Sequence, residues 1–172
     1  MLDLLKSRRS IRKYDNRPVE KEKIDELLKA ALLSPSSRAR RPWEFIAVTD
    51  GEILSQLSKC RGASSAFLAG ATLGIVVLCD SSLCDVWIED ASISATIIQL
   101  TAHSLGLGSC WIQVRERMHK DEVKAEDYIK KLLKVPEKYN VECIISLGYS
   151  AEEKEEYAEE DLIYSKLHYD RF

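Results

Sequence analysis

Apolar residues recur along the chain with two different periods, which together predict both helices and strands. Between residues 20 and 33 they fall on one helical stripe, made of Ile24, Leu27, Leu28 and Ala31. The charged residues lie mostly on the opposite side, so this segment is predicted to be a surface helix. Pro35 and the segment SPSSRARRPW end it. The next stretch, EFIAVTD (44–50), predicts a strand that is closed by Asp50 and Gly51.

Two longer apolar segments predict the centre of the fold. LGIVVLCD (73–80) is continuously apolar and β-branched, which is typical of a central strand buried on both faces. Over residues 89–105, apolar or small side chains occur nearly all the way round a helical wheel. That helix is predicted to be enclosed, either by the core or by a partner subunit. Gly106 and Gly108 are its stop signal.

The last third of the chain adds two strands, a helix and an unusual tail. Residues 111–114 and 141–147 are strand candidates, and a charged helix is predicted over 122–133 between them. The fold class is therefore α+β with a mixed sheet. The acidic stretch 152–161 precedes LIYSKLHYDRF, which carries too many aromatic residues for a solvated tail. We expect the tail to dock, with a second subunit as one candidate surface.

Length and charge narrow the class of protein. A chain of 172 residues is the size of one domain, so residues 1–172 are predicted to form a single domain. Its net charge of -3 argues against general binding to nucleic acid or to an anionic membrane. The first residues lack the long apolar stretch of a signal peptide, and the apolar runs are too short to span a bilayer. These features predict a cytoplasmic protein.

The cysteines favour buried thiols over a metal centre. The five residues form no C-x-x-C pair, and the three histidines do not fall at metal-ligand spacing near them. We therefore expect free thiols in the core and no bound metal.

The segment SRRSIRKY carries the first candidate chemistry. Arg8, Arg9 and Arg12 place three guanidinium groups within five positions, together with the hydroxyl of Ser10. Arginine binds phosphate oxygens in pairs and stays charged, so this cluster could neutralise a dianionic phosphate. The alternative interpretation is a solvated basic helix end.

Two further segments stand out, each with a simple structural alternative. SPSSRARRPW offers adjacent hydroxyl groups and more arginines, and it could equally be a polar connection. LGLGSCWIQ (105–113) is no dinucleotide-binding fingerprint, because a helix precedes it, a strand follows it and Trp111 replaces the third glycine. Its glycines would let the backbone approach a flat ligand, or they would only cap the preceding helix.

Taken in order, these segments resemble the nitroreductase family. The resemblance is carried by RRSIRKYDNRPV, PSSRARRPWEFIAV, EDASISATIIQLTAHSLGLGSCWI and LGYS, and it runs through nearly the whole chain. It implies an α+β fold in which helices flank a central mixed or antiparallel sheet. It also implies an intertwined homodimer with two FMN sites at the subunit interface and the long central helix in the dimer contact. The aromatic tail would then lie across the partner.

The resemblance assigns roles to particular residues. Arg8, Arg9 and Ser10 match the residues that hold the FMN phosphate and ribityl chain, and Arg12 matches a basic residue beside the flavin pyrimidine edge. Arg12 would be catalytic, since a fixed cation there stabilises the negative charge that develops when hydride reaches the flavin. The remaining matches are a loop against the ring and a strand near its N5 atom: Pro35, Ser36, Ser37, Trp111, Ile112 and Gln113.

Three positions depart from the family pattern. Ala39 and Arg41 stand where the family usually has Asn and Gln, so an amide to the flavin is replaced and a cation is added. This predicts a different acceptor preference. Many members have a basic pair near the C-terminus that completes the phosphate site, whereas Lys154 is the single candidate here. The chain is also short, which predicts an exposed flavin and broad acceptor tolerance.

The resemblance implies an FMN-dependent oxidoreductase. NADH or NADPH would reduce the flavin, and the flavin would reduce a nitroaromatic, a quinone or a similar planar acceptor by ping-pong kinetics. These residues specify neither the acceptor nor the choice between the two nicotinamides. Flavin fragmentation and reductive dehalogenation are alternatives within the family. A non-catalytic dimer that binds flavin as a sensor or store is the alternative from another class.

Overall fold

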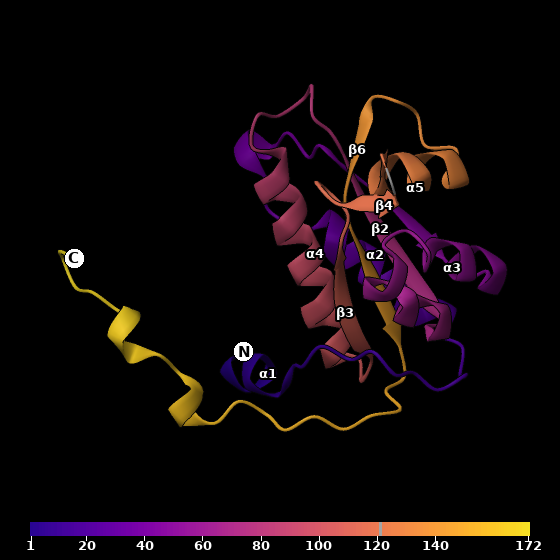
Figure 1. Ribbon diagram of the computed structural model, residues 1–172. Coiled ribbons are helices and arrows are strands. Elements are labelled where there is room, and N and C mark those ends of the chain that lie inside the picture. The colour runs from indigo at the N-terminus through magenta and orange to yellow at the C-terminus, as the bar shows by residue number, and fades with distance from the viewer. Residues whose placement is uncertain (121) are drawn as a thin grey trace.

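The structure, a computed structural model, describes residues 1–120 and 122–172. Its helices are α1 (Leu2–Ser7), α2 (Lys21–Leu32), α3 (Gly51–Leu57), α4 (Trp87–Ser104) and α5 (Ala125–Leu133). Its strands are β1 (Trp43–Val48), β2 (Leu73–Asp80), β3 (Gly108–Gln113), β4 (Met118–Lys120), β5 (Val123–Lys124) and β6 (Tyr139–Gly148). Figure 1 shows these elements packed into one body, from which the C-terminal tail departs.

Four strands form the central sheet in the order β1-β2-β6-β3, and every neighbouring pair is antiparallel. The mixed sheet expected from the strand pattern is therefore wrong. Of the two arrangements that the family resemblance implied, mixed or antiparallel, the antiparallel one is confirmed. The chain returns from β2 through α4 to the far side of β6, so β3 becomes an edge strand. Parallel pairing is limited, within the described residues, to an isolated bridge between Ser10 and Ser109. Strand β2 is buried along its whole length, which confirms its prediction as a central strand.

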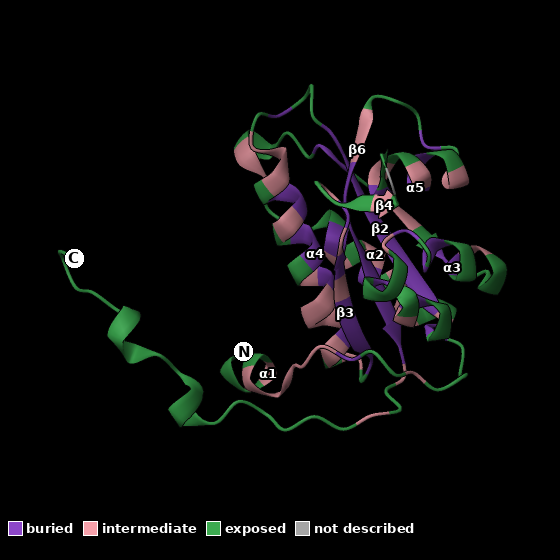
Figure 2. Cartoon of the chain, in the orientation of Figure 1, coloured by how far each residue is buried: buried purple, intermediate pink, exposed green. Residues whose placement is uncertain are grey.

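The sheet separates two apolar clusters. In Figures 1 and 2, α4 lies on one side of the sheet and α3 and α5 lie on the other. Alternate residues of a strand face opposite sides. Ile75 and Val77 accordingly pack with α2 and α4, whereas Val76 and Leu78 pack with α3 and α5. Small residues of α4 (Ala91, Ala95 and Ala102, with Ile98) let that helix lie close against the sheet.

Most predicted elements are confirmed, and the misassignments have local causes. Helix α2 matches its prediction within about one residue at each end. Asp50 and Gly51 do close the first strand, but they also begin α3, because the Asp50 side chain accepts a hydrogen bond from the Ile53 amide (2.9 Å). Helix α5 begins at Ala125 rather than at residue 122, because Val123 and Lys124 pair with β4.

The C-terminal tail is exposed and extends away from the body (Figures 1 and 2). It touches α1 where the Tyr157 amide donates to the Lys6 carbonyl (3.1 Å) and where Lys6 pairs with Glu159 (3.3 Å). Beyond that point its large apolar side chains are exposed: Leu162, Ile163, Tyr164, Leu167, Tyr169 and Phe172. Docking of the tail on a second subunit stays a prediction.

The structure also bears on the expected free thiols, on metal binding and on membrane-spanning helices. All five cysteines are free and buried, as predicted. Among residues 1–120 and 122–172, no group of His, Cys, Asp or Glu side chains is arranged to hold a metal ion. No helix in that same part of the chain has both the length and the apolar character needed to cross a bilayer.

Candidate functional site

The segment after α1 crosses the first residues of β3 and carries its arginines to that edge of the sheet. The Ile11 amide donates to the Ser109 carbonyl (3.0 Å), and further along the Asp15 amide donates to the Tyr149 carbonyl (3.0 Å). The Ala151 amide in turn donates to the Lys13 carbonyl (2.9 Å). Residues 8–15 are therefore held between β3 and the chain that leaves β6.

This arrangement encloses a cavity of about 240 Å³ beside the N-terminal segment. Three predicted cofactor ligands, Arg8, Arg9 and Lys154, line it. Glu152 lines it too, and its carboxylate lies 3.3 Å from the Lys154 ammonium. The cavity wall thus combines three cations with one carboxylate. The ion pair with Glu152 partly neutralises the charge of Lys154.

The two cavity arginines differ in what their guanidinium groups contact. Arg9 donates to the Glu155 carbonyl and lies over the Tyr157 ring, with its central carbon 4.4 Å from the ring centroid. Arg8 has a buried Nη1 atom that finds no hydrogen-bond partner within the described part of the chain. A buried charged donor without an acceptor is costly. Because Arg8 lines the cavity, an anion bound there would lie beside this guanidinium group.

Ser7 and His103 are among the residues of the cavity wall that sequence reasoning missed. The Ser7 hydroxyl lies 2.8 Å from the Asp3 carbonyl and 2.7 Å from His103 Nε2. Because its single proton goes to the carbonyl, His103 Nε2 must donate to Ser7. His103 occupies the last turn of α4, three residues before Gly106, and that place next to a glycine-rich segment was the available signal.

Arg12 and Ser10 lie near the cavity without lining it. The amides of Arg12 and Lys13 donate to one oxygen of Glu152 (2.6 and 3.2 Å), and these bonds hold the pKa of that carboxyl below its usual value. The Arg12 guanidinium lies above the Phe67 ring, with its central carbon 5.7 Å from the ring centroid. Ser10 is placed against Cys110, whose thiol pKa is raised by burial.

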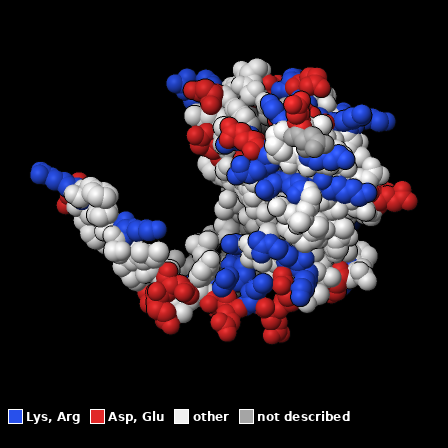
Figure 3. Space-filling model, in the orientation of Figure 1, with Lys and Arg blue, Asp and Glu red and all other residues white. Residues whose placement is uncertain are grey.

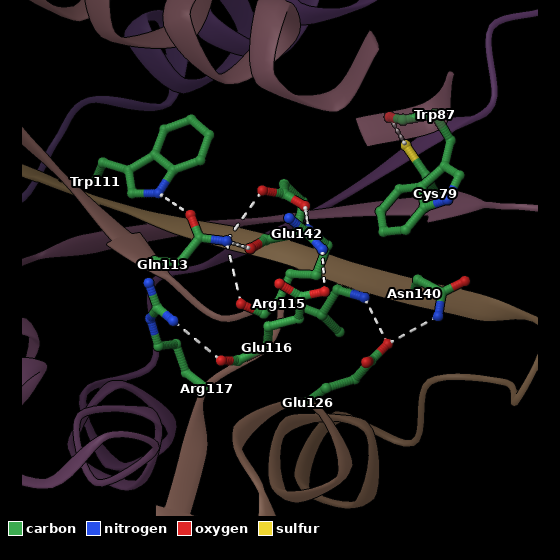
Figure 4. Close-up of polar contacts among 11 residues, drawn as sticks. Cys79, Trp87, Trp111, Gln113, Arg115, Glu116, Arg117, Glu126, Asn140 and Glu142 are labelled. Carbon is green, nitrogen blue, oxygen red and sulfur yellow. Dashed lines mark hydrogen bonds and ion pairs between the residues drawn. The ribbon is translucent and has the colours of Figure 1, made fainter. Parts of the chain in front are cut away.

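The strand segment 111–113 presents alternating faces. Ile112 points into the apolar cluster and is 1% exposed, so only its backbone can approach a ligand. Trp111 and Gln113 point the other way and are half-buried. Their side chains meet, since Trp111 Nε1 donates to Gln113 Oε1 (2.9 Å), as Figure 4 shows. Arg61 donates to the Gln113 carbonyl (3.1 Å) and places another cation beside this strand.

The loop 35–41 lies at the other end of α4. The Ser37 amide donates to Asp90 (2.9 Å) in the first turn of that helix, whereas His103 in its last turn lines the cavity. Thirteen residues of helix separate the two, or about 20 Å. Within one chain, the predicted ligands Pro35, Ser36, Ser37 and Ala39 are therefore not brought to the cavity.

The same loop has an unusual backbone. Arg38, Ala39 and Arg41 have φ angles of 51°, 53° and 50°, in the left-handed region that non-glycine residues seldom occupy. The Ser36 hydroxyl supports this shape by accepting from the Arg41 amide (3.0 Å). Strain of this kind gathers at functional sites.

The charges on this face form two groups. Figure 3 shows one group of Lys and Arg side chains beside the N-terminal segment and a second group higher in the view. Mostly uncharged atoms lie between the two groups.

Comparisons with known proteins identify the family. The Nitroreductase family pattern matches residues 5–64 and 58–149. An FMN-dependent nitroreductase from Clostridium difficile is 59% identical, with a TM-score of 0.98 and full coverage of both chains. A protein of Methanothermobacter thermautotrophicus, named provisionally as an NADH dehydrogenase/NAD(P)H nitroreductase, is 41% identical over 155 residues, 88% of this chain and 78% of its own. One of the same name from Archaeoglobus fulgidus is 38% identical, covering 93% and 91%. The chain belongs to the nitroreductase family.

Proposed function

We propose that this chain binds FMN and passes electrons through it from NADH or NADPH to a nitroaromatic, a quinone or a similar planar acceptor. The carrying observation is the cavity that Arg8, Arg9 and Lys154 line, together with the buried Nη1 of Arg8, which has no hydrogen-bond partner among residues 1–120 and 122–172. That donor set fits a phosphate group. Membership of the nitroreductase family and the 59% identity to a nitroreductase named as FMN-dependent support the same cofactor.

Phosphate binding would depend chiefly on the two arginines. Arg8 lines the cavity with a guanidinium whose buried Nη1 has no partner among the described residues, and Arg9 is held in place by the Glu155 carbonyl and the Tyr157 ring. Lys154 contributes less, since it is already paired with Glu152. Ser10 is the remaining predicted ligand of this end of the cofactor, and the bridge to Ser109 fixes its position.

Arg12 is the residue to which we assign the catalytic role. When bound, FMN would supply the hydride acceptor and the electron store. Two backbone hydrogen bonds to Glu152 fix the chain at Arg12, and the guanidinium lies over Phe67. The exposed guanidinium therefore starts from a fixed backbone, and only its side chain has to order to stabilise the anionic charge that reduction creates.

Trp111, Ile112 and Gln113 would position the ring. Ile112 anchors the strand in the core, which leaves its backbone and the flanking half-buried side chains toward the ligand. No acid or base is required of them. Donor and acceptor would use the same open face in turn, which gives ping-pong kinetics.

A homodimer would complete the site, with residues 1–172 of each copy acting as one domain. The outward side of α4 carries an apolar hollow lined by Ser92, Ile93, Thr96 and Ile97, and Ile93 is 40% exposed. A second copy packed there would bring its own loop with Pro35, Ser36, Ser37 and Ala39 toward the cavity. We expect light scattering to give a dimer, and deletion of residues 162–172 to lower the dimer fraction.

Purification and anaerobic reduction test the proposal. We expect a yellow protein whose visible absorbance bleaches with NADH or NADPH and returns when a nitro or quinone compound is added. Arg8→Gln should retain less FMN, whereas Lys13→Gln, an exposed neighbour outside the cavity wall, should retain as much as the wild type. A protein that stays colourless in excess FMN would overturn the assignment.

Two other outcomes separate the alternatives. If flavin binds but neither nicotinamide bleaches it, the non-catalytic flavin-binding interpretation replaces the enzyme. If the reduced protein releases halide from a halogenated phenol, or consumes its own flavin in oxygen, the reaction is one of the divergent activities of the family.

A further inference from the structure

Glu142 is a buried carboxylate at a place where the sheet is interrupted. On β6, Val141 pairs with Leu78 and Cys143 pairs with Val77, so Glu142 is the extra residue of a β-bulge. Val141 accordingly faces one apolar cluster and Cys143 the other. The amides of Val114 and Arg115 both donate to the Glu142 carbonyl (3.1 Å each), which ties the bulge to the end of β3. Bulges commonly redirect a side chain beside an active site.

The redirected side chain reaches the strand that the proposed cofactor would contact. Glu142 is 3% exposed, and its Oε1 accepts from Gln113 Nε2 at 3.1 Å (Figure 4). Its other oxygen lies 3.2 Å from Arg115 Nε, at ion-pair distance but without hydrogen-bond geometry. A residue needed only for packing would be apolar here, because a buried and incompletely satisfied carboxylate is unfavourable.

The hydrogen-bonding capacities of the three residues allow one arrangement. An ionised carboxylate only accepts, and an indole N–H only donates. The amide of Gln113 must therefore turn its nitrogen to Glu142 and its oxygen to Trp111, as the distances of 3.1 and 2.9 Å have it. The Glu142 carboxylate thus determines the orientation of the amide together with the Arg115 carbonyl, which accepts from the same nitrogen at 3.3 Å, and the amide holds the indole.

We propose that Glu142 is a positioning residue, which fixes Gln113 and, through it, the indole of Trp111 on the cofactor-facing edge strand. Its effect on electron transfer rests on the proposed function. Its effect on Trp111 does not, because the hydrogen-bonded chain is complete within the protein alone. This role predicts that exchanging the Gln113 amide and the Glu142 carboxylate preserves the hydrogen bonds between residues 142, 113 and 111. Two carboxylates facing each other would break them.

A reciprocal exchange tests this prediction. In Gln113→Glu, two carboxylates meet and the indole loses its support. In the double variant Gln113→Glu/Glu142→Gln, the new amide donates to the new carboxylate, which still accepts from Trp111. We expect the single variant to reduce flavin about tenfold more slowly and the double variant to recover most of that loss, the coupling expected of residues in contact. Gln113→Met interrupts the chain without adding charge and should also release Trp111.

The decisive readout is the emission of Trp111 in the protein without flavin, obtained by subtracting the Trp111→Phe spectrum. We expect a shifted emission in Gln113→Glu and in Gln113→Met, and an emission closer to that of the wild type in the double variant. Unchanged emission in both single variants, or a double variant no closer to the wild type than Gln113→Glu, would overturn the inference. Failure to bind FMN would overturn the proposed function, while the emission would still decide the role of Glu142.

Discussion

Ile11 lies so close over Gly108 that a Cβ atom added there would be 2.8 Å from Ile11 Cγ2. This contact sets the distance between the N-terminal segment and β3. Ile11 directly follows Ser10, which forms the bridge to Ser109. In the sequence it lies between Arg8 and Arg12, the two residues with the main roles in the proposed site. The absence of a side chain at position 108 is therefore a requirement of the site as well as of the fold.

Gly108→Ala should both destabilise the protein and weaken the cofactor site. Overpacking at a fully occupied position usually lowers the free energy of unfolding by about 1–3 kcal/mol. The displaced segment would also move Arg8, so FMN retention should fall. Gly70→Ala is the matched control, because nothing lies within 4 Å of a Cβ there. Urea unfolding and flavin content measure the two effects, and equal stability of the two variants would contradict the prediction.

Arg12→Gln should slow reduction of the flavin more than it weakens flavin binding. Loss of a fixed charge that acts on the developing anion typically lowers a rate by about 10²–10³. The phosphate contacts of Arg8 and Arg9 would be untouched. Stopped-flow bleaching and an FMN titration provide the comparison, with Lys13→Gln as the control. A larger loss in affinity than in rate would assign Arg12 to binding instead.

Ala39→Asn should stabilise the protein. Ala39 has a φ of 53°, and Asn tolerates this region better than other non-glycine residues do. We expect a gain of roughly 0.5–1 kcal/mol in the free energy of unfolding. Ala39→Val, with a branched side chain, should lose stability by a similar amount or more. The exposed Ala63, which has no such φ, is the control position for the Asn substitution, and a gain there as large as at Ala39 would argue against relieved strain.

Glu20 should stabilise the fold in a pH-dependent way. Hydrogen bonds from the Tyr149 hydroxyl (2.6 Å) and from Arg17 (2.6 Å) help to lower the pKa of Glu20 to about 2. In the unfolded chain a Glu side chain has a pKa of about 4.3. The lowered folded-state pKa means that the stabilisation is fully present above about pH 4.3 and is lost as the pH falls toward about 2.

The measurement compares the wild type with Glu20→Gln by urea unfolding between pH 7 and pH 3. The difference in unfolding free energy should be largest at neutral pH and should shrink below about pH 4.3. A constant difference over this range would show that the charge of Glu20 contributes nothing.

Local sequence patterns predicted the main helices and strands, but they missed short elements and one helix cap. The apolar run of β2 and the apolar wheel of α4 were predicted because both are long and regular. Helix α1 was missed, since six residues form no stable helix alone and this one contacts α4. The β4–β5 hairpin was missed because its strands are only three and two residues long. Asp50 was assigned to a turn alone, although the same residue caps a helix.

The sequence by itself determined the main helices and strands, which of their faces are apolar, and that an arginine cluster precedes a loop and a later strand, because these follow from local periodicity and side-chain chemistry. Only the tertiary structure decided that the sheet is antiparallel, that Ser7, Arg8, His103 and Lys154 share one cavity, and that a bulge turns Glu142 toward Gln113. These relationships depend on strand order and register between distant residues. No local pattern carries that information, and the loop at Ala39 would join the site only through a second copy of the chain.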